Sequence, residues 1–257
     1  MIKKGLYLLL IMLWGCEKDP VITPDQISPN NYAAYLATCD TTRVVNDGFV
    51  VAGNHWSFER TTSGLDQHFI VYYPEGASNL QLFTTQKDSN SYRDSAEAFL
   101  LRSSINTERI NHRFARIARK NQKHGFFYRV SFWYNDSLHV SPVNRVDQSI
   151  SKTETISSKE ISVAKANNGF LTFTWTPVPG ADRFWIELTD HHGDVFMSLI
   201  NTKREFQFYD LRNTVRDFTP ELRSPELIEG NEYTFSLKAI NQRGWMLALG
   251  KVTFSAP

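Results

Sequence analysis

The clearest pattern in this chain is a series of short segments in which large apolar residues alternate with small or polar ones. Turn-forming residues separate these segments, as at 177–180 and 190–194. Because alternate side chains of a strand point to opposite faces, each segment predicts a half-buried β-strand. Short strands at this spacing predict an antiparallel β-sandwich. In the C-terminal part of the chain, the segments cover residues 170–176, 184–188, 205–211, 233–239 and 251–255.

Two motifs in this region resemble a fibronectin type III domain. The segment T-W-T-P-V-P-G-A-D-R-F at residues 174–184 is similar to the second and third strands of that domain. The segment L-I-E-G-N-E-Y at residues 227–233 resembles the turn and the tyrosine corner before its sixth strand. The resemblance implies that the Tyr233 hydroxyl bonds to backbone upstream and fixes the crossover between two sheets. We expect residues 151–257 to form this domain.

The connection between Leu211 and Leu227 is longer than is usual in this family. An insertion in a sandwich is commonly a surface loop, and loops carry binding residues more often than strands do. Arg212 and Phe218 are therefore candidate contacts for a partner.

The N-terminal half repeats the plan of the C-terminal half more faintly. Residues 125–132 parallel 230–237, so Tyr128 would be a second corner tyrosine. We therefore predict an all-β chain with two tandem antiparallel β-sandwiches, similar to fibronectin type III or immunoglobulin-like domains. The first would cover residues 41–150, and the polar stretch 147–159 would be a hinge between the two.

Residues 109–124 carry six basic side chains and no acidic one. Such a cluster, with Arg116, Arg119 and Lys120 near its centre, could hold an acidic glycan, a lipopolysaccharide phosphate or nucleic acid. It could also be an ordinary solvated face. The apolar residues within it are spaced as on a helix, whereas the parallel with the second domain predicts strands, and the sequence leaves both open.

The first sixteen residues resemble the export signal of a bacterial lipoprotein. Lys3 and Lys4 precede an apolar run at 6–14, which is shorter than the roughly twenty residues needed to cross a bilayer. The L-W-G-C at residues 13–16 is similar to a lipobox. The resemblance implies a signal peptide at 1–15 and a lipid, such as palmitate, on Cys16. The alternatives are a secretory peptide cleaved elsewhere and a chance resemblance.

Residues 16–40 are predicted to form a lipid-anchored tether, because three prolines interrupt them and no hydrophobic period is present. The charged residues 17–19 resemble the signals that send lipoproteins of Bacteroidota to the outer face of the outer membrane. We therefore predict an outer-membrane location, on either the periplasmic or the cell-surface face, and favour the cell surface.

Charge and motifs narrow the function. Without residues 1–15 the chain has 26 basic and 27 acidic side chains, so its net charge does not favour nucleic acid as a partner. Beside Cys16 only Cys39 is present, so no disulfide framework is expected. The sequence has no nucleophile elbow, no P-loop and no metal-ligand motif. We predict a non-enzymatic protein without a cofactor or a metal.

Exposed aromatic residues are a further group of candidates. Trp245 and Met246 lie where the last hairpin should turn, and an apolar hairpin tip predicts contact with a sugar, a lipid or a protein. The alternative places Trp245 in the core.

Together these features predict a membrane-anchored module that binds or scaffolds an envelope protein. One alternative is a surface glycan-binding lipoprotein of a nutrient-uptake system. The other is a hydrolase whose catalytic residues are dispersed along the chain. A buried pair of carboxylates in a cleft between the sandwiches would favour the hydrolase.

Overall fold

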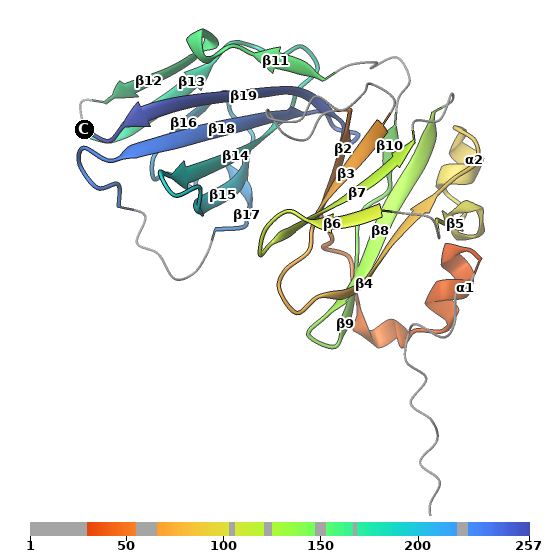
Figure 1. The fold of residues 1–257 in the computed structure, drawn as a ribbon. Coiled ribbons are helices and arrows are strands. Elements are labelled where there is room, and N and C mark those ends of the chain that lie inside the picture. The colour runs from red at the N-terminus through yellow and green to blue at the C-terminus, as the bar shows by residue number, and fades with distance from the viewer. Residues whose placement is uncertain are drawn as a thin grey trace, which may run out of the picture.

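The computed structural model describes residues 30–54, 66–102, 106–120, 125–146, 153–166, 169–219 and 226–257. Within these ranges the chain forms two β-sandwiches, which confirms the all-β prediction (Figure 1). The signal peptide predicted at 1–15, Cys16 and residues 17–29 of the tether lie outside the described residues. Lipidation at Cys16 therefore stays a prediction.

The first domain has two facing sheets and short helical segments. One sheet has the strand order β2 (Val50–Gly53), β3 (Asp66–Tyr72), β7 (Phe114–Lys120), β6 (Asn106–Arg109). The other has the order β1 (Val44–Val45), β9 (Ser137–Val140), β8 (Phe126–Tyr134), β4 (Ser78–Thr84), β5 (Leu100–Leu101), with β10 (Asn144–Val146) also beside β8. The helical segments are α1 (Tyr32–Ala37), η2 (Thr41–Arg43), α2 (Asn90–Arg93) and η3 (Ala96–Ala98).

The second domain also has two facing sheets. The larger has the order β11 (Glu154–Ile156), β19 (Met246–Ser255), β18 (Glu232–Ile240), β14 (Arg183–Asp190), β15 (Val195–Asn201), β17 (Thr214–Asp217). The smaller has the order β12 (Ile161–Lys165), β13 (Leu171–Trp175), β16 (Glu205–Gln207), and η4 (Ser158–Glu160) precedes β12. The central strands follow the alternation of the sequence, so that Phe184, Ile186 and Leu188 of β14 all enter the core.

The two predicted corner tyrosines have different partners. The Tyr233 hydroxyl accepts a hydrogen bond from the backbone N–H of Ile228 at 3.0 Å, which is the upstream backbone contact that the resemblance implied. The Tyr128 hydroxyl is fully buried and donates to the carbonyl oxygen of Gly244 at 3.0 Å, in the other domain. The prediction that Tyr128 forms a corner within its own domain is therefore wrong, because the second domain supplies the acceptor.

The folded part of the chain begins earlier than residue 41. Asn31 caps α1 by accepting from the Ala34 N–H at 2.8 Å. Tyr32 and Tyr35 of this helix are 3% and 2% exposed, and the Trp133 indole donates to the Tyr35 hydroxyl at 3.2 Å. Residues 30–40 of the predicted tether thus belong to the first domain, because their aromatic side chains cover its outer face.

The basic stretch 109–124 forms strands as far as the structure describes it. It supplies the end of β6 and all of β7, which pair in antiparallel register. Arg116 and Arg119 are three positions apart on β7, so they point to opposite faces of the sheet. The expectation of a single basic patch is wrong for this pair.

The two domains are docked against each other through an apolar cluster. The outward face of the β2–β3–β7 sheet contributes Val51, Ile70 and Phe114 to it. The outward face of the larger sheet of the second domain contributes Trp185, Ile200, Ile240 and Leu249, together with Phe218 and Met246. In Figure 1 the end of the β18–β19 hairpin lies beside β2 of the first domain, where Ala52 and Trp245 form a β-bridge. Buried aromatic and aliphatic contacts of this kind make an interface resemble a domain core, and the two domains are therefore a single packed unit.

The described part of the predicted hinge belongs to the second domain. Strand β11 pairs in parallel with β19, and the buried Thr153 hydroxyl donates to the Met246 carbonyl oxygen at 3.1 Å. The prediction of a hinge over 147–159 is therefore wrong for residues 153–159, and 147–152 lie outside the described residues.

The hairpin turn between β18 and β19 enters the first domain. Trp245 is 1% exposed and belongs to the core cluster of that domain, and Met246 is 0% exposed. The Ala52 N–H donates to the Gly244 carbonyl oxygen at 2.8 Å, beside the bond from Tyr128. The prediction of an exposed hairpin tip at Trp245 and Met246 is therefore wrong, because the tip is buried where the two domains pack together.

Candidate binding cleft between the domains

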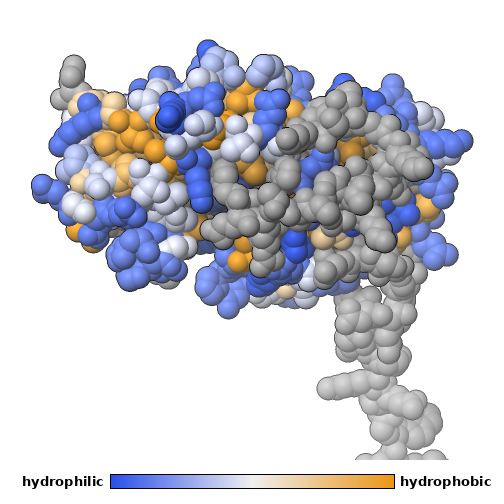
Figure 2. Space-filling view, turned by 45° about the horizontal axis from the view of Figure 1, so that its top comes forward, coloured by the Kyte–Doolittle hydropathy of each residue, from blue (hydrophilic) through white to orange (hydrophobic). Residues whose placement is uncertain are grey.

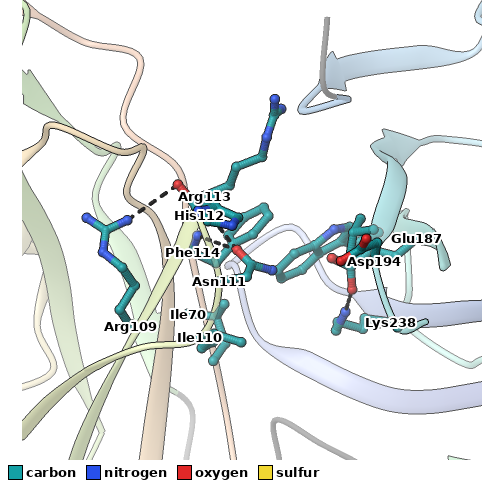
Figure 3. Close-up of a pocket in the computed structure, with 13 residues that line it drawn as sticks. Ile70, Arg109, Ile110, Asn111, His112, Arg113, Phe114, Glu187, Asp194 and Lys238 are labelled. Carbon is teal, nitrogen blue, oxygen red and sulfur yellow. Dashed lines mark hydrogen bonds and ion pairs between the residues drawn. The ribbon is translucent and has the colours of Figure 1, made fainter. Parts of the chain in front are cut away.

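A cleft of about 980 Å³ opens where the two sandwiches meet (Figure 3). Its wall in the first domain is the turn between β6 and β7, residues 110–113. The opposite wall is residues 193–195, at the turn between β14 and β15. The lining is completed by Ile70, Arg109, Phe114, Trp185, Glu187 and Lys238. The cleft is therefore made by the docking of the domains and belongs to neither of them alone.

The floor of the cleft is aromatic and rigidly held. The ring centroids of Phe114 and Trp185 are 4.6 Å apart, and each side chain is 2% exposed. The Trp185 indole donates to the Ser198 hydroxyl at 2.9 Å, which satisfies its only polar atom. Because both rings also belong to the apolar cluster between the domains, a change in domain orientation would disturb the floor.

A largely buried ion pair lies beside the floor. Lys238 Nζ donates to Glu187 Oε2, and the two side chains are 10% and 13% exposed. The Lys238 ammonium also lies 4.0 Å from the centroid of the Trp185 ring, close enough for a cation–π interaction. Glu187 additionally accepts a long hydrogen bond of 3.5 Å from the Ser198 hydroxyl. Since both charges are paired, this part of the lining is locally neutral.

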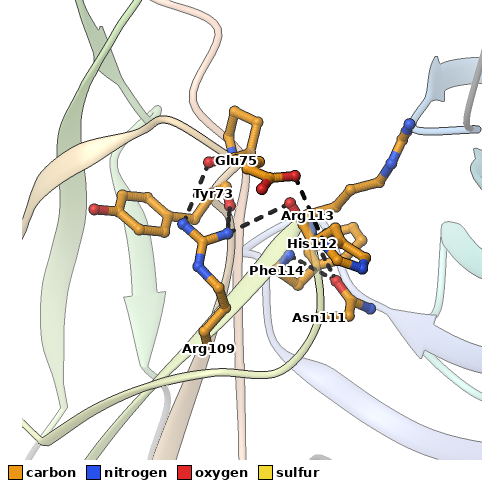
Figure 4. Close-up of polar contacts among 8 residues, drawn as sticks. Tyr73, Glu75, Arg109, Asn111, His112, Arg113 and Phe114 are labelled. Atoms are coloured by element: carbon orange, nitrogen blue, oxygen red, sulfur yellow. Dashed lines mark hydrogen bonds and ion pairs between the residues drawn. The ribbon is translucent and has the colours of Figure 1, made fainter.

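The turn between β6 and β7 is held by its own polar side chains (Figure 4). Asn111 Oδ1 accepts from the backbone N–H groups of Arg113 and Phe114, both at 2.9 Å. Arg109 donates to the carbonyl oxygen of Tyr73 at 2.9 Å and lies 4.8 Å from the centroid of its ring. These contacts fix the shape of one wall before any ligand arrives.

Polar and ionisable groups at the rim are exposed. His112 and Glu75 lie 3.7 Å apart with side chains that are 90% and 84% exposed. Asp194, on the opposite wall, is also exposed. The rim can therefore make polar contacts with a partner whose apolar side chains reach the floor.

The cleft does not contain the pair of buried carboxylates that would favour a hydrolase. Glu187 and Asp194 both line it, but Asp194 is exposed and Glu187 is held by Lys238. The described residues also contain no group of three or more His, Cys, Asp and Glu side chains placed to hold a metal ion. The arrangement suits recognition through an apolar floor and a polar rim.

The predicted site residues that the structure describes lie outside this cleft, and Phe218, Trp245 and Met246 are buried where the domains meet. Phe218 is 2% exposed and stacks on Tyr72, with ring centroids 4.8 Å apart. Its carbonyl oxygen accepts from Arg113. The prediction that Phe218 is a surface contact is therefore wrong, because β17 in the long connection pairs with β15 and carries Phe218 into the interface. Trp245, on which the glycan hypothesis depended most, is buried too.

The basic candidates are separated. Arg212 is exposed and pairs with its neighbour Asp210 at 2.6 Å. The Arg212 guanidinium, as a hydrogen-bond donor, lowers the pKa of that carboxyl to about 2. Arg116 pairs with Glu108 on one face of β7, Arg119 lies over the Phe126 ring on the other, and Lys120 is the last residue of that strand. Binding by these residues stays a prediction.

Two of the residues that line the cleft can be recognised in the sequence by their departure from simple alternation. Trp185 lies between Phe184 and Ile186, so apolar side chains face both sides of β14. A strand with two apolar faces is expected where both faces are covered. Lys238 lies inside the apolar run of β18, and a charged residue at such a position is expected to form an ion pair, because burying an unpaired charge is costly.

Apolar residues on the outer surface are dispersed. Figure 2 shows patches of apolar residues interspersed with hydrophilic ones over the second domain. Single exposed apolar residues are normal on soluble surfaces. The exposed large apolar residues in the described ranges are Val45, Phe170, Leu211, Val215 and Ile228.

Comparisons with known proteins show no family. No family model matches the sequence, and no curated protein matches it. A chain of a cytokine receptor complex is similar in structure at 10% identity and a TM-score of 0.29, over 82% of this chain and 96% of that chain. A tetra-tandem repeat from the extending region of a large adhesion protein has 11% identity and a TM-score of 0.24, over 82% of this chain and 49% of that chain.

The full ectodomain of mouse nectin-like molecule 4, with domains Ig1–Ig3, has 12% identity and a TM-score of 0.22, over 82% of this chain and 64% of that chain. At identities and TM-scores this low, the similarities carry no argument about function. The architecture is instead established by the strand order described above. In the ranges described, no helix has the length and apolar character needed to span a bilayer.

Proposed function

We propose that this protein is a lipid-anchored, non-enzymatic module of a bacterial cell envelope that binds a protein partner in the cleft between its two sandwiches. The observation that carries this proposal is the apolar interface, which holds both walls of the cleft in one orientation. A preformed site loses less entropy on binding than a site that must be assembled. The aromatic floor and exposed polar rim match the usual anatomy of a protein interface.

The anchoring part of the proposal is supported by the sequence alone. Lys3, Lys4, the apolar run and Cys16 resemble a lipoprotein signal, and residues 17–19 favour the outer membrane, with the cell surface preferred over the periplasmic face. A lipid on Cys16 would confine the cleft to one membrane surface. Confinement raises the effective concentration of a partner on the same surface, so that weak contacts suffice.

The first experiment is co-purification of the tagged full-length protein from native envelopes in mild detergent. We expect a stoichiometric envelope protein to be recovered with the wild type and lost with the Cys16→Ala variant, which would not be lipidated. His112→Glu and Val195→Glu, one on each wall, should also lose it while leaving the protein in the membrane. Lys159→Glu is the control, because Lys159 is exposed and does not line the cleft.

Each arm of this experiment tests a different part of the proposal. Retention of the partner in both wall variants would remove the cleft from the proposal. Recovery of unlipidated wild-type protein in the soluble fraction would remove the anchor. Recovery of the wild-type protein without any partner would contradict the binding function.

A further inference from the structure

Two arginines of the first domain, Arg102 and Arg119, lie near each other. Neither forms an ion pair with a carboxylate in the described part of the chain. By contrast, Arg116 on the same strand as Arg119 forms an ion pair with Glu108. Partly buried charges are normally paired, since removing a charge from water is costly.

Arg119 extends from the end of β7 toward the space between the two sheets. It is two residues beyond the buried Ile117, so the two side chains lie on the same inward face of the strand. The guanidinium carbon of Arg119 is 4.9 Å from the centroid of the Phe126 ring. Its Nη1 atom is buried and has no hydrogen-bond partner among the described residues. A donor that points into the protein without an acceptor costs free energy unless a ligand supplies one.

Arg102 approaches the same end of the sandwich from the opposite sheet. Its backbone N–H donates to the carbonyl oxygen of Leu82 at 3.0 Å, which holds it beside β4. Its Nε donates to the hydroxyl oxygen of Thr84 at 2.5 Å, and Thr84 is fully buried. The remaining donors of the Arg102 guanidinium have no acidic partner in the described ranges.

The two positive charges affect each other. Burial, together with the positive charge of Arg102, lowers the pKa of Arg119 to about 10. Burial also lowers the pKa of Arg102. Both guanidinium groups still carry their charge at neutral pH, so they repel each other inside a region of reduced solvation. An anion between them would remove the repulsion and satisfy the open donors.

We propose that Arg102 and Arg119 form a binding site for a phosphate group at the end of the first sandwich, between its two sheets. The planar guanidinium fork fits phosphate oxygens in bidentate fashion. A phosphate near neutral pH carries between about one and two negative charges, which balances the two arginines. The site lies in the first domain, away from the cleft, and does not depend on the function proposed for the cleft.

The test is isothermal titration calorimetry of the full-length protein in detergent with inorganic phosphate, against chloride at the same ionic strength. We expect binding to the wild type and at least tenfold weaker binding to Arg119→Gln and Arg102→Gln. Arg116→Gln is the matched control on the same strand and should bind phosphate as the wild type does. A parallel titration with glucose 6-phosphate distinguishes the source, because only a site for a phosphate carried on a larger molecule would accept it.

Thermal unfolding provides a second readout that a purely structural role would not produce. Without phosphate, Arg119→Gln should melt at the same temperature as the wild type or higher, because it removes a partly buried positive charge that is repelled by Arg102. Phosphate should raise the Tm of the wild type and not that of the variant. The proposal is overturned if the wild type shows no phosphate-dependent heat or Tm shift, or if Arg119→Gln retains the wild-type response.

Discussion

Trp245 is the residue through which we expect the two domains to depend on each other most strongly. It belongs to the second domain in sequence, yet its indole is 1% exposed within the core of the first. Removing it by Trp245→Ala should therefore leave a cavity in the first domain and loosen the docking of the second. The adjacent hydrogen bonds to the Gly244 carbonyl oxygen, from Ala52 and Tyr128, would lose the packing that holds them.

The size of the effect follows from the burial of the ring. An aromatic side chain of this kind buries about 150–250 Å². At about 25 cal/mol per Å² this amounts to about 4–6 kcal/mol. Measured truncations of buried tryptophan to alanine cost about 3–5 kcal/mol. We expect a loss of about 4 kcal/mol in the free energy of unfolding for Trp245→Ala.

A second variant separates the ring from its polar atom. The Trp245 indole N–H is buried without a hydrogen-bond partner among the described residues. Trp245→Phe therefore removes part of the apolar area but also an unsatisfied donor, and we expect it to cost only about 1–2 kcal/mol. Phe170→Ala is the control, because Phe170 is 52% exposed and surface changes usually stay within about 0.5 kcal/mol.

Urea unfolding followed by far-UV circular dichroism, with calorimetry alongside, measures these differences. The wild type should unfold in one transition, because the domains share an apolar interface. Trp245→Ala should unfold in two, since the docking is weakened before either sandwich melts. If Trp245→Ala keeps a single transition and lies within 0.5 kcal/mol of the wild type, the reasoning about a shared core is refuted.

Three further predictions concern the ion pair, the turn and the pH dependence. Glu187→Gln leaves Lys238 charged and largely buried, so we expect the free energy of unfolding to fall by up to about 3–5 kcal/mol. Most of this loss should be recovered in the double variant Glu187→Gln/Lys238→Met, and equal losses in the single and double variants would contradict the prediction. Gly244→Ala should destabilise more than Gly193→Ala in thermal melts. Both glycines have positive φ, but a Cβ at 244 would lie 2.7 Å from Asn144 Oδ1, whereas a Cβ at 193 meets nothing within 4 Å. Burial raises the pKa of Tyr35 from 10.0 to about 12. The contribution of Tyr35 to the free energy of unfolding is therefore fully present below pH 10 and is lost as pH rises toward 12. Tyr35→Phe should flatten the decline of stability across this window, and an unchanged slope would be the contrary result.

The strands and the class of fold could be predicted from the order of residues. Alternation along β13 and β18 is a local property, because a strand with one buried face must place apolar residues at every second position. The corner at Tyr233 was also predictable, since the backbone N–H that donates to its hydroxyl belongs to Ile228, only five residues upstream. Features whose partners lie within a few residues, or within one sheet, can be derived from the order of residues.

What covers the outward faces of the sheets depends on contacts between distant parts of the chain. Trp185, Phe114 and Phe218 form the interface and the floor of the cleft, but their contacts join residues about seventy to a hundred positions apart. Alternation indicates that a face is apolar, but it does not indicate which distant surface packs on that face. The same reason explains Trp245 and Tyr128, whose roles depend on the docking of one domain on the other. A hairpin tip that looks exposed when its own domain is considered alone becomes core when a second domain closes over it.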